Sequence, residues 1–263
     1  MTTTWDPLTI LNGLNPNPRY LNRRMKEILS FTEDPIPGIQ VQQDEFQNAL
    51  VHAIIEGPEG TPYEGGFFYF ILVYPNDYPV NPLKVKFMTT GGGKVRFNPN
   101  LYNCGKLCLS ILGTWSGPEW SSVYTIRTTL LSIQTILNET PLCNEPGYNT
   151  AAKDKIDAYN NVVRHETMRV AIVGAAEEAL AELAKPTTTT TEPPSTIRLP
   201  RELHEHVLRR FAANYDKHLE ICEKHKSADG TRFESSFGGN QGTYIYSKLL
   251  ERLVTIKGRL AEL

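Results

Sequence analysis

The sequence has no long hydrophobic run and no strong charge imbalance, and each lack excludes a class of function. No apolar segment approaches the roughly 20 residues that a membrane-spanning helix needs, and the opening residues MTTTWDPLTI lack the charged-then-apolar order of a secretory signal. The 27 Lys and Arg against 29 Asp and Glu give a net charge of -2, so no overall field attracts nucleic acid or a membrane surface. We therefore expect the cytoplasm, with the nucleus as a second compartment, and no nucleic-acid or membrane partner.

The chain also has few cysteines, and they do not form the paired pattern of a structural zinc site. In the cytoplasm we expect Cys104, Cys108, Cys143 and Cys222 to be reduced thiols. His218, Cys222 and His225 have separations that occur among metal ligands, but no CxxC pair accompanies them. We interpret His218 and Cys222 as positions on an ordinary amphipathic helix and expect no metal.

Hydrophobic patterning predicts a fold of mixed α and β structure. A helix is predicted over residues 19–31. Its apolar stripe consists of Leu21, Met25, Ile28 and Leu29. Apolar runs separated by Gly and Pro then predict four antiparallel strands in a meander. The strands cover residues 39–42, 47–56, 66–74 and 84–88. The segment 74–82 has too many prolines for a central strand and is predicted to be a rigid exposed loop.

The second half of the chain is predicted to be mainly helical. A helix is expected to begin near Ser121 or Thr125. Its buried stripe consists of Ile126, Leu130, Ile133 and Leu137. A long helix is predicted over about 157–183, and two amphipathic helices follow much later, from Leu203 to Cys222 and from Leu249 to Leu263.

A change of composition divides the chain into parts. Residues 185–200 are rich in Thr and Pro and cannot bury enough apolar area to order themselves, so they are predicted to be a linker. The predicted parts are a lead-in 1–16, a core 17–184, the linker 185–200 and a helical C-terminal extension 201–263. Two helices alone make a poor core, so we expect the extension to pack back on the core, although a coiled coil with a partner would show the same pattern.

The segment FNPNLYNCGKLCLSILGTW, residues 97–115, places Cys108 in an apolar run without a nearby histidine. One interpretation is a buried small hydrophobic residue. A cysteine hydrolase would need a histidine base, and no known pairing signature is present. A thiol that accepts an acyl group from another thioester needs less help, because the donor is already activated and an ordinary thiol pKa of about 8.5 leaves a few per cent thiolate. Asn100 could donate to the tetrahedral oxyanion, although an Asn after Pro often only ties a turn.

Four segments, in their order, resemble the ubiquitin-conjugating (UBC) enzyme family. They are YPNDYPVNPLKVKF, FNPNLYNCGKLCLSILGTW, WSSVYTIRTTLLSIQTIL and NEPGYN, and an ordered set of motifs is more specific than a lone pattern. The resemblance covers roughly residues 17–184. It implies an α+β UBC fold with an N-terminal helix, a four-stranded antiparallel meander and C-terminal helices, here followed by a helical extension. It also implies an enzyme that carries ubiquitin, or a ubiquitin-like modifier, as a thioester and transfers it to a lysine amine.

The resemblance assigns the family's functional residues one at a time. Cys108 matches the thioester cysteine, and Asn100 matches the asparagine that stabilises the oxyanion or shapes the active-site loop. The family's His-Pro-Asn begins with Asn98 here, at a position that is generally structural. The gate that positions the incoming lysine falls at Asn144 or Glu145. No metal or organic cofactor is implied, since ATP is used by the upstream enzyme.

The resemblance further implies an activating enzyme and a ligase as partners. The candidate activating enzyme is ubiquitin-like modifier-activating enzyme 6. Its docking residues would be Arg19, Arg23, Arg24 and Lys26, although a solvated helix face would show the same charges. The ligase would contact Val80, Pro82, Ser122 and Val123. Val80 stands where an aromatic is usual and Val123 ends a loop that is Ser-Pro-Ala in the family, so we expect common ligases to bind weakly.

Two other functions are compatible with the same fold. A non-catalytic UBC-fold module would bind ubiquitin without chemistry, although the intact Cys108 and its LSIL context argue against it. Alternatively, the C-terminal helices would form a docking platform, with the UBC core as a scaffold. The patterns lead us to expect that loading of Cys108 survives deletion of residues 186–263.

Overall fold

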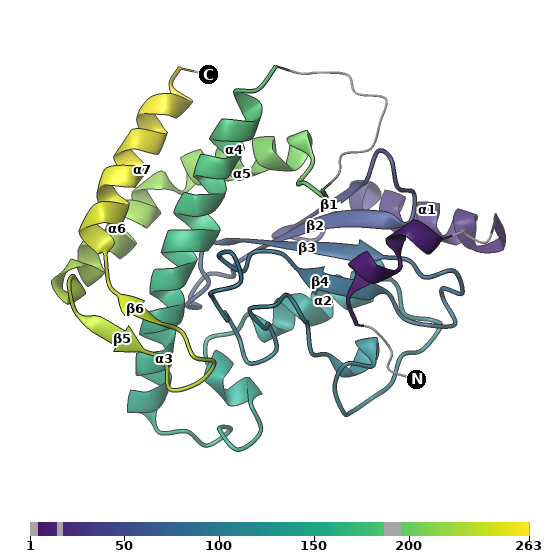
Figure 1. The fold of residues 1–263 in the computed structure, drawn as a ribbon, viewed down its shortest axis with the longest axis horizontal. Coiled ribbons are helices and arrows are strands. Elements are labelled where there is room, and N and C mark those ends of the chain that lie inside the picture. The colour runs from purple at the N-terminus through teal and green to yellow at the C-terminus, as the bar shows by residue number, and fades with distance from the viewer. Residues whose placement is uncertain (1–4, 15–17, 187–195, 263) are drawn as a thin grey trace.

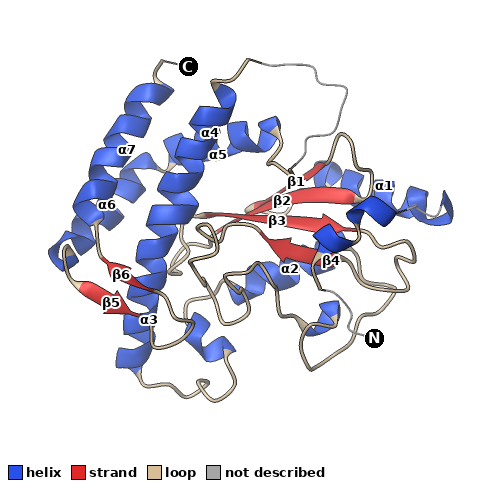
Figure 2. Cartoon of the chain, in the orientation of Figure 1, coloured by secondary structure: helices blue, strands red, loops and turns tan. Residues whose placement is uncertain are grey.

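Four antiparallel strands form the centre of the molecule, and helices cover both faces of the sheet (Figure 1, Figure 2). The structure is a computed structural model that describes residues 5–14, 18–186 and 196–262. The strands lie in the order β1-β2-β3-β4, with bounds Ile39–Gln43, Leu50–Glu56, Phe67–Val73 and Lys84–Phe87. The α+β fold with its antiparallel meander is therefore confirmed.

The helices fall into a core set and an extension set. The core set contains α1 (Pro18–Glu33), α2 (Ile126–Ile136) and a continuous rod made of α3 (Lys153–Glu166), the π-helical segment η5 (Thr167–Gly174) and α4 (Ala175–Leu183). The extension contains α5 (Arg201–Ala213), α6 (Tyr215–His225), the hairpin strands β5 (Arg232–Glu234) and β6 (Gln241–Thr243), and α7 (Tyr246–Leu260). In Figure 1 the rod stands between the sheet and the pair α6 and α7. Within the described ranges, no helix combines the length and apolar character needed to cross a membrane.

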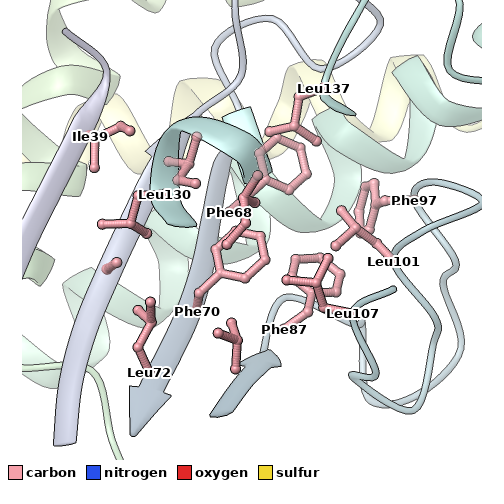
Figure 3. Packing of buried hydrophobic residues seen from close by; sticks show 14 of the residues in the cluster. Ile39, Phe68, Phe70, Leu72, Phe87, Phe97, Leu101, Leu107, Leu130 and Leu137 are labelled. Atoms are coloured by element: carbon pink, nitrogen blue, oxygen red, sulfur yellow. The ribbon is translucent and has the colours of Figure 1, made fainter. Parts of the chain in front are cut away.

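One face of the sheet packs against α2 and forms what we call the front core. Phe68 and Phe70 of β3 point to this side and meet Leu130 and Leu137 (Figure 3). The whole predicted stripe of α2 is buried there, which confirms it. The segment that leads to the predicted site cysteine packs on the same aromatic cluster through Phe97, Leu101 and Leu107. The front core therefore supports that segment directly.

The opposite face of the sheet meets the extension in a second cluster, the back core. Ile54 and Phe67 enter it from the sheet. Helices α4, α5 and α7 supply most of the rest, including Ala176, Ala179, Leu180, Leu203, Val207, Phe211, Leu249, Leu253 and Ile256. The extension thus packs back on the core, as expected from its two helical patterns. Strand β3, FFYFILV, lacks polar alternation because both of its faces are buried.

The rest of the back face lies under the N-terminal segment. Leu50, Ile71 and Val73 are buried there, and Ile10 and Leu11 pack against them. Ile10 lies between two short 3-10 turns, Pro7–Thr9 and Leu11–Gly13, and Leu11 begins the second. Of the predicted lead-in and linker, residues 1–4, 15–16 and 187–195 lie outside the described residues.

Helix α1 faces the core with a side other than its apolar stripe. Leu21, Met25 and Leu29 are 39%, 50% and 53% exposed, so most of the stripe faces solvent. The buried positions are Arg24, Glu27 and Phe31, and the Glu27 carboxylate accepts a hydrogen bond from the backbone N–H of Ile126 at 3.1 Å. A carboxylate is favourable at this place because it satisfies a donor at the N-terminus of α2 and complements the helix dipole.

The expectation of an exposed loop over 74–82 is correct only in part. Tyr74 and Tyr78 are fully buried, and both hydroxyls donate to Glu27, at 3.4 and 2.7 Å. Buried hydroxyls require a hydrogen-bond partner, and the Glu27 carboxylate provides it, so the loop packs against α1. Val80 at the far side of the loop remains exposed.

Three boundaries of the C-terminal half differ from the prediction. The rod begins at Lys153, before the expected start near 157. The single helix expected from Leu203 to Cys222 is divided at Asn214, which ends α5 and precedes α6. The β5–β6 hairpin is not predicted, because its strands contain three residues each and show no apolar alternation. The final residue, Leu263, lies outside the described residues.

Candidate functional site

Cys108 is held by backbone hydrogen bonds on both sides. Its N–H donates to the carbonyl of Asn100 at 2.9 Å. Just beyond it, the Thr114 hydroxyl accepts from the N–H of Leu109 at 2.9 Å and donates to the carbonyl of Leu107 at 2.7 Å. The cysteine is 2% exposed, so its thiol lies just beneath the surface at a fixed position.

Asn100 is attached to the cysteine by its side chain as well as by its backbone. Its Nδ2 donates to the carbonyl of Cys108 at 2.8 Å, and its own N–H donates to Oδ1 of Asn98 at 2.9 Å. This arrangement shapes the loop around the thiol. An amide nitrogen carries two hydrogens, so a second N–H of Asn100 remains for an oxyanion, and both roles suggested by the sequence are compatible with this geometry.

Asn98 anchors the segment to the interior. It is fully buried, and its Nδ2 donates to the Tyr63 hydroxyl and to the carbonyl of Ile136, each at 2.8 Å. Buried amides with satisfied donors rigidify a loop. The residue that stands in place of the family's histidine therefore joins the site to the end of α2.

The charge balance around Cys108 leaves the thiol mostly protonated. Burial raises the pKa of the Cys108 thiol, and the nearby Cys104 adds to this increase. The positive charges of Lys106 and Arg96 and a hydrogen bond from Tyr102 act in the opposite direction without reversing it. A thiol of this kind suits attack on an activated acyl donor better than attack on an amide. No sequence pattern singles out Arg96 or Tyr102, although Arg96 directly precedes FNPN.

The structure separates the two candidates for the gate. Asn144 is part of the buried network: its Nδ2 donates to the carbonyl of Ile136 at 3.1 Å and contacts Oδ1 of Asn98 at 3.5 Å. Glu145 is half-buried, and its charge contributes to the raised pKa of Tyr159. The amide of Asn144 is thus committed to the loop, whereas Glu145 has a carboxylate at the next position.

The predicted docking residues on α1 have different environments. Arg24 is 2% exposed, and its guanidinium donates to the carbonyl of Pro75 at 3.0 Å. This placement gives Arg24 an internal contact in place of the exposed position expected for docking. Arg23 is half-buried and Lys26 is exposed. The side chain of Arg19 lies outside the described residues.

The predicted ligase loops lie at the surface and are joined to each other. Val80 and Val123 are 67% and 76% exposed, Ser122 is also exposed, and Pro82 is half-buried. The indole N–H of Trp120 donates to the carbonyl of Pro79 at 2.8 Å. Because Trp120 precedes one loop and Pro79 belongs to the other, this bond fixes the two loops relative to each other.

The metal-like spacing in α6 corresponds to a packed helix face. His218 and Cys222 are buried, and His225 is half-buried. Burial raises the pKa of the Cys222 thiol to about 12, which disfavours the thiolate that a metal requires. Among the described residues, no three His, Cys, Asp or Glu side chains come together as a metal site would need.

Comparisons with known proteins show which family this chain resembles. The family model described as "Ubiquitin-conjugating enzyme" matches residues 23–168. Ubiquitin-conjugating enzyme E2 Z from Danio rerio is 38% identical over 99% of this chain and 75% of its own length. The human E2 Z is 38% identical over 98% of this chain and 69% of its own length.

A solved structure is similar to part of this chain. Human ubiquitin-conjugating enzyme E2 G1 is 29% identical, covers 47% of this chain and 98% of its own, and has a TM-score of 0.41. The match of the family model over more than half of the chain, together with identity that continues through the extension, shows the family. This chain belongs to the ubiquitin-conjugating enzyme family.

Proposed function

We propose that the chain accepts ubiquitin, or a ubiquitin-like modifier, as a thioester on Cys108 and transfers it to a lysine amine. The observation that supports this most is the Cys108 loop, in which the Asn100 side chain donates to the carbonyl of Cys108. Among the described residues, the groups that influence the Cys108 thiol include no histidine or carboxylate that would act as its base. The Cys108 thiolate attacks the thioester carbonyl of the activating enzyme, whose own thiolate leaves. A neutral lysine amine then attacks the new thioester, an isopeptide bond forms, and the Cys108 thiolate leaves.

The residues around Cys108 have separate tasks in this proposal. Asn100 keeps the loop in place and offers its second amide hydrogen to the oxyanion of the tetrahedral intermediate. Glu145 acts as the gate, attracting the incoming ammonium group and accepting its proton. The reaction uses no metal or organic cofactor of this protein, and ATP is used by the activating enzyme.

The activating enzyme docks on the exposed face of α1. This face presents Lys26 beside Leu21, Met25 and Leu29, so the contact combines apolar surface with charge. Similarity to E2 Z relatives over nearly the whole chain supports ubiquitin-like modifier-activating enzyme 6 as that partner. The ligase uses the joined loops of Val80 and Val123. Cytoplasm and nucleus remain the predicted compartments.

A loading assay tests the thioester. Purified chain, ATP, ubiquitin and each candidate activating enzyme are incubated, and the products are separated on reducing and non-reducing gels. We expect a reductant-sensitive adduct that Cys108→Ala abolishes and Cys108→Ser converts to a reductant-resistant ester. Cys143→Ala is the matched control, since this half-buried thiol lies outside the Cys108 loop and its loss should leave loading intact.

Two results would contradict the proposal. An adduct that persists in Cys108→Ala would place the chemistry on another residue. Absence of loading with every competent activating enzyme, while ubiquitin still binds the folded chain, would favour the non-catalytic module.

A further inference from the structure

The loop between β5 and β6, residues 235–240 with the sequence SSFGGN, reaches from the extension to the segment before Cys108. We call it the hairpin loop. Figure 1 shows the hairpin crossing α3, apart from the helices α5 to α7. The loop is 127 or more residues from Cys108 along the chain, and it belongs to none of the motifs that carry the family resemblance.

Asn240 attaches the hairpin loop to the backbone of Arg96. Its Oδ1 accepts from the N–H of Arg96 at 2.8 Å, and its Nδ2 donates to the carbonyl of Arg96 at 2.7 Å. The side chain is 3% exposed. Such a two-point amide contact satisfies both polar groups of one residue, so it fixes where the segment 96–100 begins.

Phe237 holds the side chain of the same arginine. The Arg96 guanidinium carbon lies 4.7 Å from the centre of the Phe237 ring and 3.8 Å from the centre of the Tyr102 ring. From between these rings the guanidinium donates to the carbonyl of Pro99 at 2.6 Å. Stacking on two aromatic faces restricts a side chain that would otherwise be flexible. Arg96 is thereby kept beside Asn100 and near Cys108.

Phe237 also contacts the turn that contains Glu145. Its ring meets the ring of Tyr148 edge to face, with centres 5.8 Å apart. The N–H of Tyr148 donates to the carbonyl of Glu145, the proposed gate, at 3.0 Å. One side chain of the extension therefore touches both the arginine that precedes Asn100 and the turn that carries Glu145.

We propose that the hairpin loop forms part of the active-site surroundings, and that Phe237 and Asn240 are positioning residues that hold Arg96 against the Cys108 loop. The inference rests on the proposed role of Cys108. Besides burial, four groups influence the pKa of that thiol: Lys106, Tyr102, Cys104 and Arg96. Lys106, Tyr102 and Cys104 lie in the same loop as Cys108, whereas Arg96 depends on the extension for its place. The extension thus contributes to the reactivity of Cys108 without touching the substrate.

Alkylation of Cys108 across a pH series tests this inference without any activating enzyme. The full chain is treated with iodoacetamide from about pH 6.5 to 10, and Cys108 is followed by mass spectrometry. Trypsin cleaves after Lys106 and so places Cys104 and Cys108 in different peptides. For Phe237→Leu we expect the midpoint to rise by about half a pH unit, which corresponds to about threefold slower alkylation at pH 7.

Matched variants separate positioning from loss of structure. Phe237→Tyr keeps the aromatic face and should restore the midpoint, and Ser236→Ala, at an exposed position of the same loop, should leave it unchanged. Asn240→Ala should raise the midpoint as Phe237→Leu does. Unchanged midpoints in both Phe237→Leu and Asn240→Ala would overturn the inference. If the midpoints move but the wild-type chain never loads, the proposed function fails while the role of the hairpin loop stands.

Discussion

The front and back cores differ in the way they are assembled. The front core joins α2 and the segment before Cys108 to one face of the sheet, and much of it lies within the family motifs. The back core joins Ile54 and Phe67 to α5 and α7, elements far away in the sequence and beyond residue 168, where the family match ends. Both cores share strand β3. The extension therefore covers part of one face of the sheet and is not a separate domain that follows the core.

The back core bears on the expectation that loading of Cys108 survives deletion of residues 186–263. Deletion of residues 186–263 would expose Ile54, Phe67, Met168 and Ile172, which are now buried. Exposing so much apolar area costs several kcal/mol, so we now expect the truncated chain to unfold. Loss of loading in such a truncation would consequently say little about docking, and point variants are the better tools.

The largest expected loss of stability comes from truncating one large buried side chain in each core. Phe211→Ala in the back core should cost about 3–5 kcal/mol, and Leu130→Ala in the front core about 2–5 kcal/mol, because both side chains are fully buried. Urea unfolding is followed by tryptophan fluorescence and by far-ultraviolet circular dichroism. Each variant should shift one common transition, since β3 belongs to both cores. Two separate transitions, each sensitive to one variant, would show that the cores fold independently.

A smaller effect should appear only in the back core and only in acid. His218 is 1% exposed, neither ring nitrogen has a hydrogen-bond partner among the described residues, and burial lowers its pKa to about 4. Between pH 6.5 and pH 4 the unfolded chain binds a proton there and the folded chain does not. Stability therefore falls as the pH falls through this window, by about 3 kcal/mol in total from this residue.

The variant His218→Leu should lose that part of the acid sensitivity. Unfolding free energies at pH 7, 5 and 4 measure it, with Leu130→Ala as the front-core control that keeps the wild-type slope. Equal slopes in the two variants would show that His218 takes up its proton in the folded state.

The smallest effect concerns the contact of the sheet with α5. Burial alone would raise the pKa of Glu56, but hydrogen bonds from His206 at 2.9 Å and Arg210 at 3.0 Å outweigh it and lower the pKa. Its stabilisation is therefore complete above the unfolded value of about 4.3 and disappears as the pH falls through the lower folded value. Glu56→Gln should cost about 1–2 kcal/mol at pH 7.

The pH dependence of this variant provides the check. The difference in unfolding free energy between wild type and Glu56→Gln should shrink in acid below about pH 4.3. Glu59→Gln, in an exposed pair with Lys217, should change stability by about 0.5 kcal/mol or less. A difference for Glu56→Gln that stays constant down to pH 3 would mean that the carboxylate itself does not carry the contact.

Patterns in the sequence predict those parts of the fold that apolar burial decides. The stripe from Ile126 to Leu137 and the strand runs were assignable because hydrophobic period and length agree there. On α1 the same rule fails, since buried tyrosine hydroxyls and the N-terminus of α2 require Glu27 at the core and leave Met25 in solvent. The hydrophobic periodicity of the sequence carries no information about hydrogen bonds from residues that are distant in the chain.

The candidate site likewise contains local contacts that the sequence can predict and long-range contacts that it cannot. The place of Cys108 and its bond to Asn100 follow from a short local segment that a motif can describe. The contacts of Arg96 with Phe237 and Asn240 join positions more than 140 residues apart, so neither neighbours nor spacing could indicate them. The short FGG sequence marks only a turn.

The π-helical segment η5 has a consequence for how the length of this chain can vary. Before it, α3 directs Tyr159 and Val163 into the front core, and after it α4 directs Ala176 and Leu180 into the back core. Removing a single residue from the segment would turn everything beyond it by about 100°, and either core would then face the wrong side of the helix. Packing in the front core and in the back core together fixes the number of residues in η5. Insertions and deletions should therefore be poorly tolerated there, although η5 contains none of the proposed site residues.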